Sequence, residues 1–148
     1  MSEHLLEVNH LKKYFKTGKG ILQAVDDVSF TLDYGKTLGL VGESGCGKST
    51  TGRSILRLVE PTEGEVLFDG KDVTKLNARE MRLMRREMQI IFQDPFSSLN
   101  PRRTVEELIG EPFRWNSVHL SRTQKKEKIL QLMDTVGLAQ RLINVYPH

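Results

Sequence analysis

Apolar positions in the first part of this 148-residue chain follow the period of β-strands. Between Val25 and Leu32, apolar side chains recur at nearly every second position, which predicts a strand with one buried face. Leu5–Val8 predicts an earlier strand, and Thr17–Gly20 predicts the turn between the two. The run Thr37–Val41 is apolar on both sides, which is typical of a strand in the middle of a parallel sheet.

Strands and helices then alternate. Ser49–Leu58 is predicted to be a helix, which Pro61 and the following glycine end. Glu65–Phe68 and Met88–Phe92 predict two further strands. This alternation predicts an α/β fold.

Two helix starts carry a capping box, in which a side chain at the cap and one three residues later exchange hydrogen bonds with the backbone. Asn77 with Glu80 predicts a helix that reaches about Glu87. Ser121 with Gln124 predicts a second helix further along.

The helix predicted after Ser121 has one apolar face. Ile129, Met133 and Val136 recur at helical spacing, and Gly137 is placed to close the helix. Ala139–Val145 predicts a short further helix.

The character of the chain changes near Gln93, from alternating strands and helices to helices alone. We therefore predict two parts, residues 1–92 as a core that contains the glycine-rich segment Gly42–Thr50 and residues 93–148 as a loop followed by a partial helical subdomain.

Composition narrows the class of protein. Hydrophobic residues make up 38% and charged residues 28%, as in soluble domains. No apolar run approaches the roughly 20 residues of a membrane-spanning helix, and the first residues lack the pattern of a secretory signal. We expect a cytoplasmic protein that docks on the inner face of the membrane.

The formal net charge of +3 adds little. The basic residues at Arg79–Arg86 and Lys125–Lys128 are interpreted as solvated helix faces, and no motif for nucleic-acid binding accompanies them. We therefore expect no nucleic-acid partner. With the single cysteine Cys46, no disulfide forms within the chain.

The segment GESGCGKST, Gly42–Thr50, carries the candidate chemistry. Gly42, four further residues, Gly47, Lys48 and Ser49 match the phosphate-binding loop, with a predicted strand before and a helix after. Glycines let several backbone N–H groups converge on one anion, and the helix start adds its positive dipole.

The loop residues predict separate roles toward a nucleoside triphosphate. Lys48 reaches the β- and γ-phosphates, the Ser49 hydroxyl ligates Mg²⁺ and Thr50 meets the α-phosphate. The cofactor-binding set is the whole loop: Gly42, Glu43, Ser44, Gly45, Cys46, Gly47, Lys48, Ser49 and Thr50. The simplest interpretation of Cys46 is a small residue that fits the loop. However, a thiol beside a lysine at a helix start is also predicted to react with alkylating reagents, and ATP is predicted to protect it.

Together with Tyr14, this loop and the segment IIFQDPFSSLNPR, Ile90–Arg102, resemble the nucleotide-binding domain of an ABC transporter, in particular the oligopeptide/dipeptide importer branch. The resemblance covers essentially the whole chain. It implies a P-loop NTPase core with an antiparallel β subdomain and the start of a helical subdomain, in an ATPase that uses ATP and Mg²⁺.

Residue roles follow from the resemblance. Tyr14 would stack on adenine, with Phe15 as the alternative stacking residue, and Gln93 would complete the Mg²⁺ shell and sense the γ-phosphate. The loop Asp94–Arg103, with its prolines and Phe96, would contact the transmembrane permease subunits. A second ABC ATPase subunit and, indirectly, a solute-binding protein are the other implied partners.

Other features of the family lie outside these residues: a signature motif, the aspartate that supports Mg²⁺, the glutamate that polarises water, and a switch histidine, with which His148 is not to be equated. The chain is therefore expected to be the N-terminal part of a domain that imports peptides or related solutes, binding nucleotide without hydrolysing it alone. The alternatives are a non-catalytic module that holds nucleotide or competes for the membrane partner, and an ABC-type ATPase without a transport role. A P-loop kinase or GTPase is disfavoured.

Overall fold

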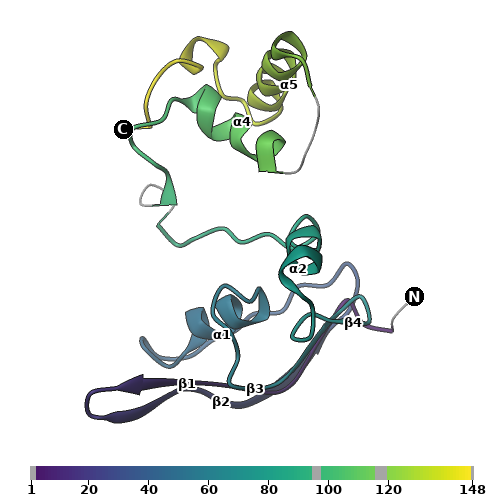
Figure 1. Cartoon of the computed structure of the whole chain (residues 1–148), viewed down its shortest axis with the longest axis vertical. Coiled ribbons are helices and arrows are strands. Elements are labelled where there is room, and N and C mark those ends of the chain that lie inside the picture. Colours follow the sequence, from purple (N-terminus) through teal and green to yellow (C-terminus); the bar gives the residue numbers. More distant parts are fainter. Residues whose placement is uncertain (1–2, 95–97, 116–119, 148) are drawn as a thin grey trace. The chain divides into compact units, whose positions relative to one another are not determined.

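The computed structural model describes residues 3–94, 98–115 and 120–147 (Figure 1). The chain divides into two compact units, Met1–Gln89 and Ile90–His148. The structural boundary thus falls just before Gln93, and the roles assigned to the two parts stay predictions. Within the described ranges, no helix has both the length and the apolar character needed to cross a bilayer.

The first unit contains a four-stranded antiparallel sheet in the order β2-β1-β3-β4. Its strands are β1 (Leu6–Thr17), β2 (Gly20–Leu32), β3 (Glu63–Phe68) and β4 (Lys71–Asp72). The strands expected at Leu5–Val8, Val25–Leu32 and Glu65–Phe68 all lie in it, and the first two are much longer than their apolar patterns indicated. Together they form the long hairpin of Figure 1, with its turn at the predicted position.

Bulges interrupt this hairpin and set which side chains face the core. The pairing of β1 with β2 shifts between Val8 and Leu11 and twice more before Tyr14. At the first shift, His10 has a φ of 51°. An extra, unpaired residue in a strand interrupts the alternation of side chains between the two faces of the sheet. Val8 and Leu11 are consequently both fully buried although they are three residues apart.

Helix α1 (Lys48–Ile55) covers one face of the sheet (Figure 1). The core beneath it is aliphatic and is formed mainly by the buried residues Val8, Leu11, Val25, Val66, Val73, Met81 and Met88. Helix α1 is shorter than the predicted Ser49–Leu58, because its hydrogen bonding ends in a turn at Leu56.

Helix α2 (Ala78–Met84) confirms the first capping box. Asn77 Oδ1 accepts from the backbone N–H groups of Arg79 and Glu80 at 3.0 Å, and Glu80 Oε2 accepts from the backbone N–H of Asn77 at 2.9 Å. The helix ends at Met84, before the expected Glu87.

Two predicted strands are wrong: neither Thr37–Val41 nor Met88–Phe92 is a strand in the structure. Val41 is 90% exposed and Ile91 is 92% exposed. A parallel strand forms only where a neighbour completes its hydrogen bonds, and every pairing in the described sheet is antiparallel. Their apolar character indicated burial, but these residues have no strand beside them within the described part of the chain.

The second unit contains α4 (Val105–Trp115), α5 (Arg122–Thr135) and the 3₁₀ helix η1 (Gln140–Leu142). Its core consists of Ile129, Met133 and Ile143, with flanking side chains from α4. The only regular structure within the predicted helix Ala139–Val145 is thus one short 3₁₀ turn.

The start of α5 confirms the second capping box. Ser121 Oγ accepts from Gln124 N–H at 3.2 Å, and Gln124 Oε1 accepts from Ser121 N–H at 2.9 Å. Gly137 closes the segment with a φ of 70°. Ile129 and Met133 are fully buried, whereas Val136 is 76% exposed and does not share their environment. The helix ends at Thr135, before the periodicity reaches Val136.

Candidate functional site

The loop Gly42–Thr50 leads into α1 and faces solvent. Residues Gly42–Cys46 are exposed, and Gly47 caps the helix in the left-handed conformation, with a φ of 96°. Helix α1 begins at Lys48, as the motif predicts. The loop therefore presents the N-terminal end of a helix, where backbone N–H groups lack partners from the preceding turn.

Gly47 is held directly against strand β2. A Cβ atom at this position would lie 2.0 Å from the carbonyl oxygen of Ala24 and 3.7 Å from Val25 Cγ2. Only glycine has both the φ and the room for this approach. The close contact with the backbone of β2 thus sets the position of Gly47, and with it the end of the loop, relative to the sheet.

Thr51 supports the same glycine from inside the helix. Its backbone N–H and its side-chain Oγ1 both donate to the carbonyl oxygen of Gly47, at 2.8 Å and 3.1 Å. The side chain of Thr51 is buried. Gly47 is thereby held between strand and helix, and the start of α1 cannot shift without breaking these contacts.

Lys48 folds back over the loop. Its ammonium donates to the carbonyl oxygens of Gly42 at 2.7 Å and Glu43 at 2.6 Å, and Cys46 Sγ lies 3.5 Å away. The cation is therefore already at the mouth of the loop, held by main-chain oxygens rather than by a carboxylate.

The backbone N–H groups at the start of α1 show that the loop can bind an anion. Within the described residues, no acceptor meets the backbone N–H groups of Gly47, Lys48, Ser49 and Thr50. Ser49 is exposed, and its hydroxyl is placed at the same helix end. Unpaired N–H groups, a helix dipole and a lysine ammonium together make a binding site for phosphate.

The two candidate aromatic residues lie on opposite faces of the sheet. Val25 is buried beneath α1, so the adjacent Asp26 points away from it, and the Tyr14 hydroxyl donates to Asp26 Oδ1. This hydrogen bond, together with desolvation, raises the pKa of Tyr14 above its usual value.

Phe15 points the other way. Lys13 pairs directly with Val25, which is buried in the core beneath α1, and residues directly opposite each other in a sheet point to the same face. Lys13 Nζ lies 4.8 Å from the centre of the Phe15 ring, which confirms that these two side chains share a face. The aromatic residue on the same face as the loop is thus Phe15, whereas Tyr14 is engaged on the outer face.

Gln93 lies in the second unit, in an exposed bend. Its predicted role toward the loop stays a prediction. Of the predicted partner-binding loop Asp94–Arg103, residues 95–97, including Phe96, lie outside the described residues.

Sequence reasoning missed a residue that anchors the far end of α1. Arg57 donates through one guanidinium nitrogen to the carbonyl oxygens of Val73 at 2.8 Å and Leu76 at 2.7 Å, and it pairs with Glu60 at 2.8 Å. These contacts tie the end of α1 to the segment after β4. An arginine near a helix end has no sequence pattern that distinguishes this role from solvation.

Comparisons with known proteins agree with this geometry. The profile of the family described as ABC transporter matches residues 25–147. The oligopeptide transport ATP-binding protein OppF of Bacillus subtilis is 51% identical over 149 residues, covering 100% of this chain and 49% of that protein. OppF of Haemophilus influenzae is 50% identical over 155 residues, covering 99% of this chain and 47% of that protein. The chain thus spans about half the length of these curated relatives.

Solved structures show the same fold. The dimeric ATP-binding cassette MJ0796, in a post-hydrolysis state bound to ADP and Pi, superposes with a TM-score of 0.81 at 29% identity, over 96% of this chain and 61% of that one. For cbiO1 of Clostridium perfringens the TM-score is 0.71 at 21% identity, over 98% of this chain and 55% of that one. The predicted fold class, an incomplete ABC ATPase cassette, is confirmed.

Proposed function

The chain belongs to the ABC transporter family, and from this premise we propose that it forms part of an ATP-binding subunit that couples ATP binding and hydrolysis to the import of peptides. The observation that carries the proposal is the loop at the start of α1, where four unpaired N–H groups and the Lys48 ammonium converge. This arrangement suits a chain of phosphates and has no other evident use.

The loop residues have distinct tasks in binding ATP. The N–H groups of Gly47–Thr50 donate to phosphate oxygens, and Lys48 exchanges the carbonyl oxygens of Gly42 and Glu43 for the β- and γ-phosphates. The exposed Ser49 hydroxyl is the loop's ligand for Mg²⁺. When bound, Mg²⁺ neutralises charge on the phosphate oxygens.

Phe15 rather than Tyr14 is our proposed adenine-stacking residue. Phe15 lies on the face of the sheet that carries α1, and the Tyr14 hydroxyl is held by Asp26 on the opposite face. A ring on the wrong face of a strand cannot reach a base whose phosphates lie at the loop.

Peptide import rests on the relatives, two of which are named as oligopeptide transport ATP-binding proteins. Within that function, Gln93 senses the γ-phosphate and completes the Mg²⁺ shell. The partners are transmembrane permease subunits and a second ATPase subunit, with a solute-binding protein acting indirectly. The dimeric cassette MJ0796 supports the ATPase pairing, and the subunit would sit at the inner face of the membrane.

Hydrolysis is proposed for the complete domain rather than for these residues alone. Catalysis of phosphoryl transfer needs a positioned water as well as a phosphate grip. The described residues offer the grip, and no carboxylate accompanies Lys48 in its contacts. We expect nucleotide binding with negligible turnover from the 148-residue chain.

Calorimetry with Mg-ATP tests the proposal. The chain should bind saturably, and Lys48→Ala should abolish binding, whereas Lys36→Ala, an exposed lysine outside the loop, should not change it. A folded chain that fails to bind ATP, or equal binding by both variants, would contradict the assigned grip. Turnover comparable to a complete domain would contradict the expected inactivity alone.

A further inference from the structure

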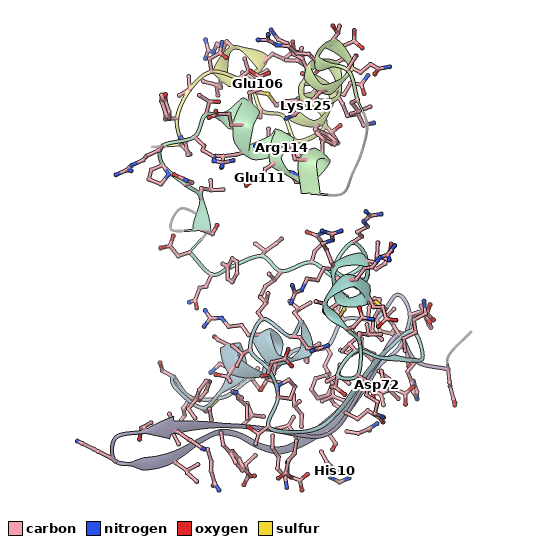
Figure 2. All side chains as sticks on the ribbon, in the orientation of Figure 1. His10, Asp72, Glu106, Glu111, Arg114 and Lys125 are labelled. Carbon is pink, nitrogen blue, oxygen red and sulfur yellow. The ribbon has the colours of Figure 1, made fainter. Side chains whose placement is uncertain are left out.

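A second cationic site lies in the other unit, where three segments meet. Asn100, Arg102 and Arg103 precede α4, Arg114 lies near the end of α4, and Lys125 belongs to the first turn of α5. With Glu107 they line a hollow of about 360 Å³, which is within the usual size of small-ligand pockets. Figure 2 labels Arg114 and Lys125, which come from different helices to this one hollow.

The hollow carries excess positive charge. Arg103 pairs with Glu111 at 3.3 Å, and Glu107 accepts from the backbone N–H of Thr104 at 2.9 Å. Four cations thus face two carboxylates, which leaves two positive charges in excess. In the part of the chain that the structure describes, neither Arg102 nor Arg114 nor Lys125 has an ion pair.

Lys125 is positioned rather than solvated. Gly110 is buried in α4, and a Cβ atom there would lie 2.6 Å from Lys125 Cε and 2.8 Å from its Nζ. The lysine therefore lies across the backbone of α4 in a space that the missing side chain provides. Gly110 thus lets the ammonium of Lys125 lie against α4, the helix that carries Arg114.

We propose that this hollow binds the phosphate group of a doubly charged anion, either a soluble phosphorylated molecule or the headgroup of an anionic lipid. One arginine guanidinium group can bind two phosphate oxygens at once, and three arginines line the hollow. A phosphate monoester carries about −1.5 to −2 charges near neutral pH, which matches the excess of two, whereas one carboxylate would not. The site shares no residue with the ATP grip and does not depend on the proposed function.

A site-resolved titration with inorganic phosphate tests the proposal. Amide signals of the isotope-labelled chain are followed by NMR at constant ionic strength, with chloride as the reference anion, in the wild type and in Lys48→Ala. Saturable shifts at residues 100–103, 114 and 125 that persist in Lys48→Ala are expected. Arg114→Gln with Lys125→Gln should weaken binding about tenfold or more, since two charge-assisted contacts are lost.

The matched control is Arg122→Gln with Lys128→Gln, which removes the same charge from exposed positions of α5 that do not line the hollow. It should change the affinity by less than about twofold, because long-range charge effects are screened by salt. Equal weakening by the two double variants would overturn the proposal, because it would reduce the site to general surface charge.

Vesicles distinguish the two sources of phosphate. Sedimentation with phosphatidylcholine vesicles is compared with and without added phosphatidic acid. Binding that needs phosphatidic acid and is lost in Arg114→Gln with Lys125→Gln assigns the site to a lipid headgroup, and phosphate shifts without vesicle binding assign it to a soluble ligand. The proposal is overturned if phosphate causes no saturable shifts at the hollow and vesicle binding does not depend on Arg114 and Lys125.

Discussion

The two proposed anion sites of this chain use different donors, main-chain groups at one and side chains at the other. At the loop Gly42–Thr50, the donors are mainly backbone N–H groups, fixed by the contact of Gly47 with β2. At the hollow in the second unit, the donors are side chains, and Gly110 only makes room for one of them. A site made of backbone donors is rigid and loses its affinity when the backbone moves. A site made of side chains loses affinity in smaller steps, as single side chains are displaced or removed.

The largest expected effect comes from Gly47→Ala. The new Cβ would overlap the carbonyl oxygen of Ala24, so the loop must lift away from β2. We expect a loss of about 3 kcal/mol in the free energy of unfolding and of more than about a hundredfold in ATP affinity. Chemical denaturation and calorimetry measure the two losses.

Gly45→Ala is the control for Gly47→Ala. It also has a positive φ, of 83°, but nothing lies within 4 Å of its Cβ. It should cost only about 1 kcal/mol of stability. Equal destabilisation by both variants would show that backbone conformation, and not the contact with β2, decides the effect.

Phe15→Ala should reduce ATP affinity about tenfold, because aromatic stacking contributes about 1–3 kcal/mol per base. Tyr14→Leu, which removes the ring held by Asp26 on the opposite face, should leave the affinity nearly unchanged. Calorimetry with ATP measures both. The reverse order of effects would return the stacking role to Tyr14.

Cys46 reports on the loop from within. Its thiol is exposed, and Lys48 Nζ lies 3.5 Å from Sγ. Alkylation should block ATP binding, and bound ATP should slow the reaction about tenfold, because the nucleotide covers the loop and engages the lysine. Mass spectrometry of the labelled chain measures the rate, and equal rates with and without ATP would exclude protection.

Gly110→Ala should have the smallest effect. The added Cβ meets the end of the flexible Lys125 side chain and, at 3.2 Å, Ile129 Cδ1. We expect phosphate affinity at the hollow to fall about threefold while stability changes by less than about 1 kcal/mol, since alanine also favours the helix. NMR titration and thermal unfolding measure these quantities. A large loss of stability would show that Gly110 serves packing rather than the position of Lys125.

The same difference explains what could be predicted from the sequence. The loop is contiguous, so the spacing of Gly42, Gly47 and Lys48 encodes it, and both capping boxes are equally local. The hollow is assembled from three segments, and Lys125, viewed along α5 alone, has the pattern of a solvated face. Its role depends on Gly110 in the neighbouring helix, a relation that no local pattern contains.

Burial was predicted less well than local shape. Thr37–Val41 has the composition of a central parallel strand, but such a strand depends on neighbours that sequence periodicity does not supply. Similarly, adjacent positions in a strand alternate in face only if no bulge intervenes. The shifts before Tyr14 therefore decided between Tyr14 and Phe15, and only the structure shows them.

The exposed segments Leu38–Val41 and Ile90–Phe92 bear on how the chain behaves in solution. Apolar residues beside backbone groups that pair with no other described strand favour association between chains, as exposed edge strands do. We therefore expect these two segments to promote association between chains. The apparent melting temperature should depend on protein concentration, and a charged residue at Val41 or Ile91 should raise the concentration at which precipitation begins.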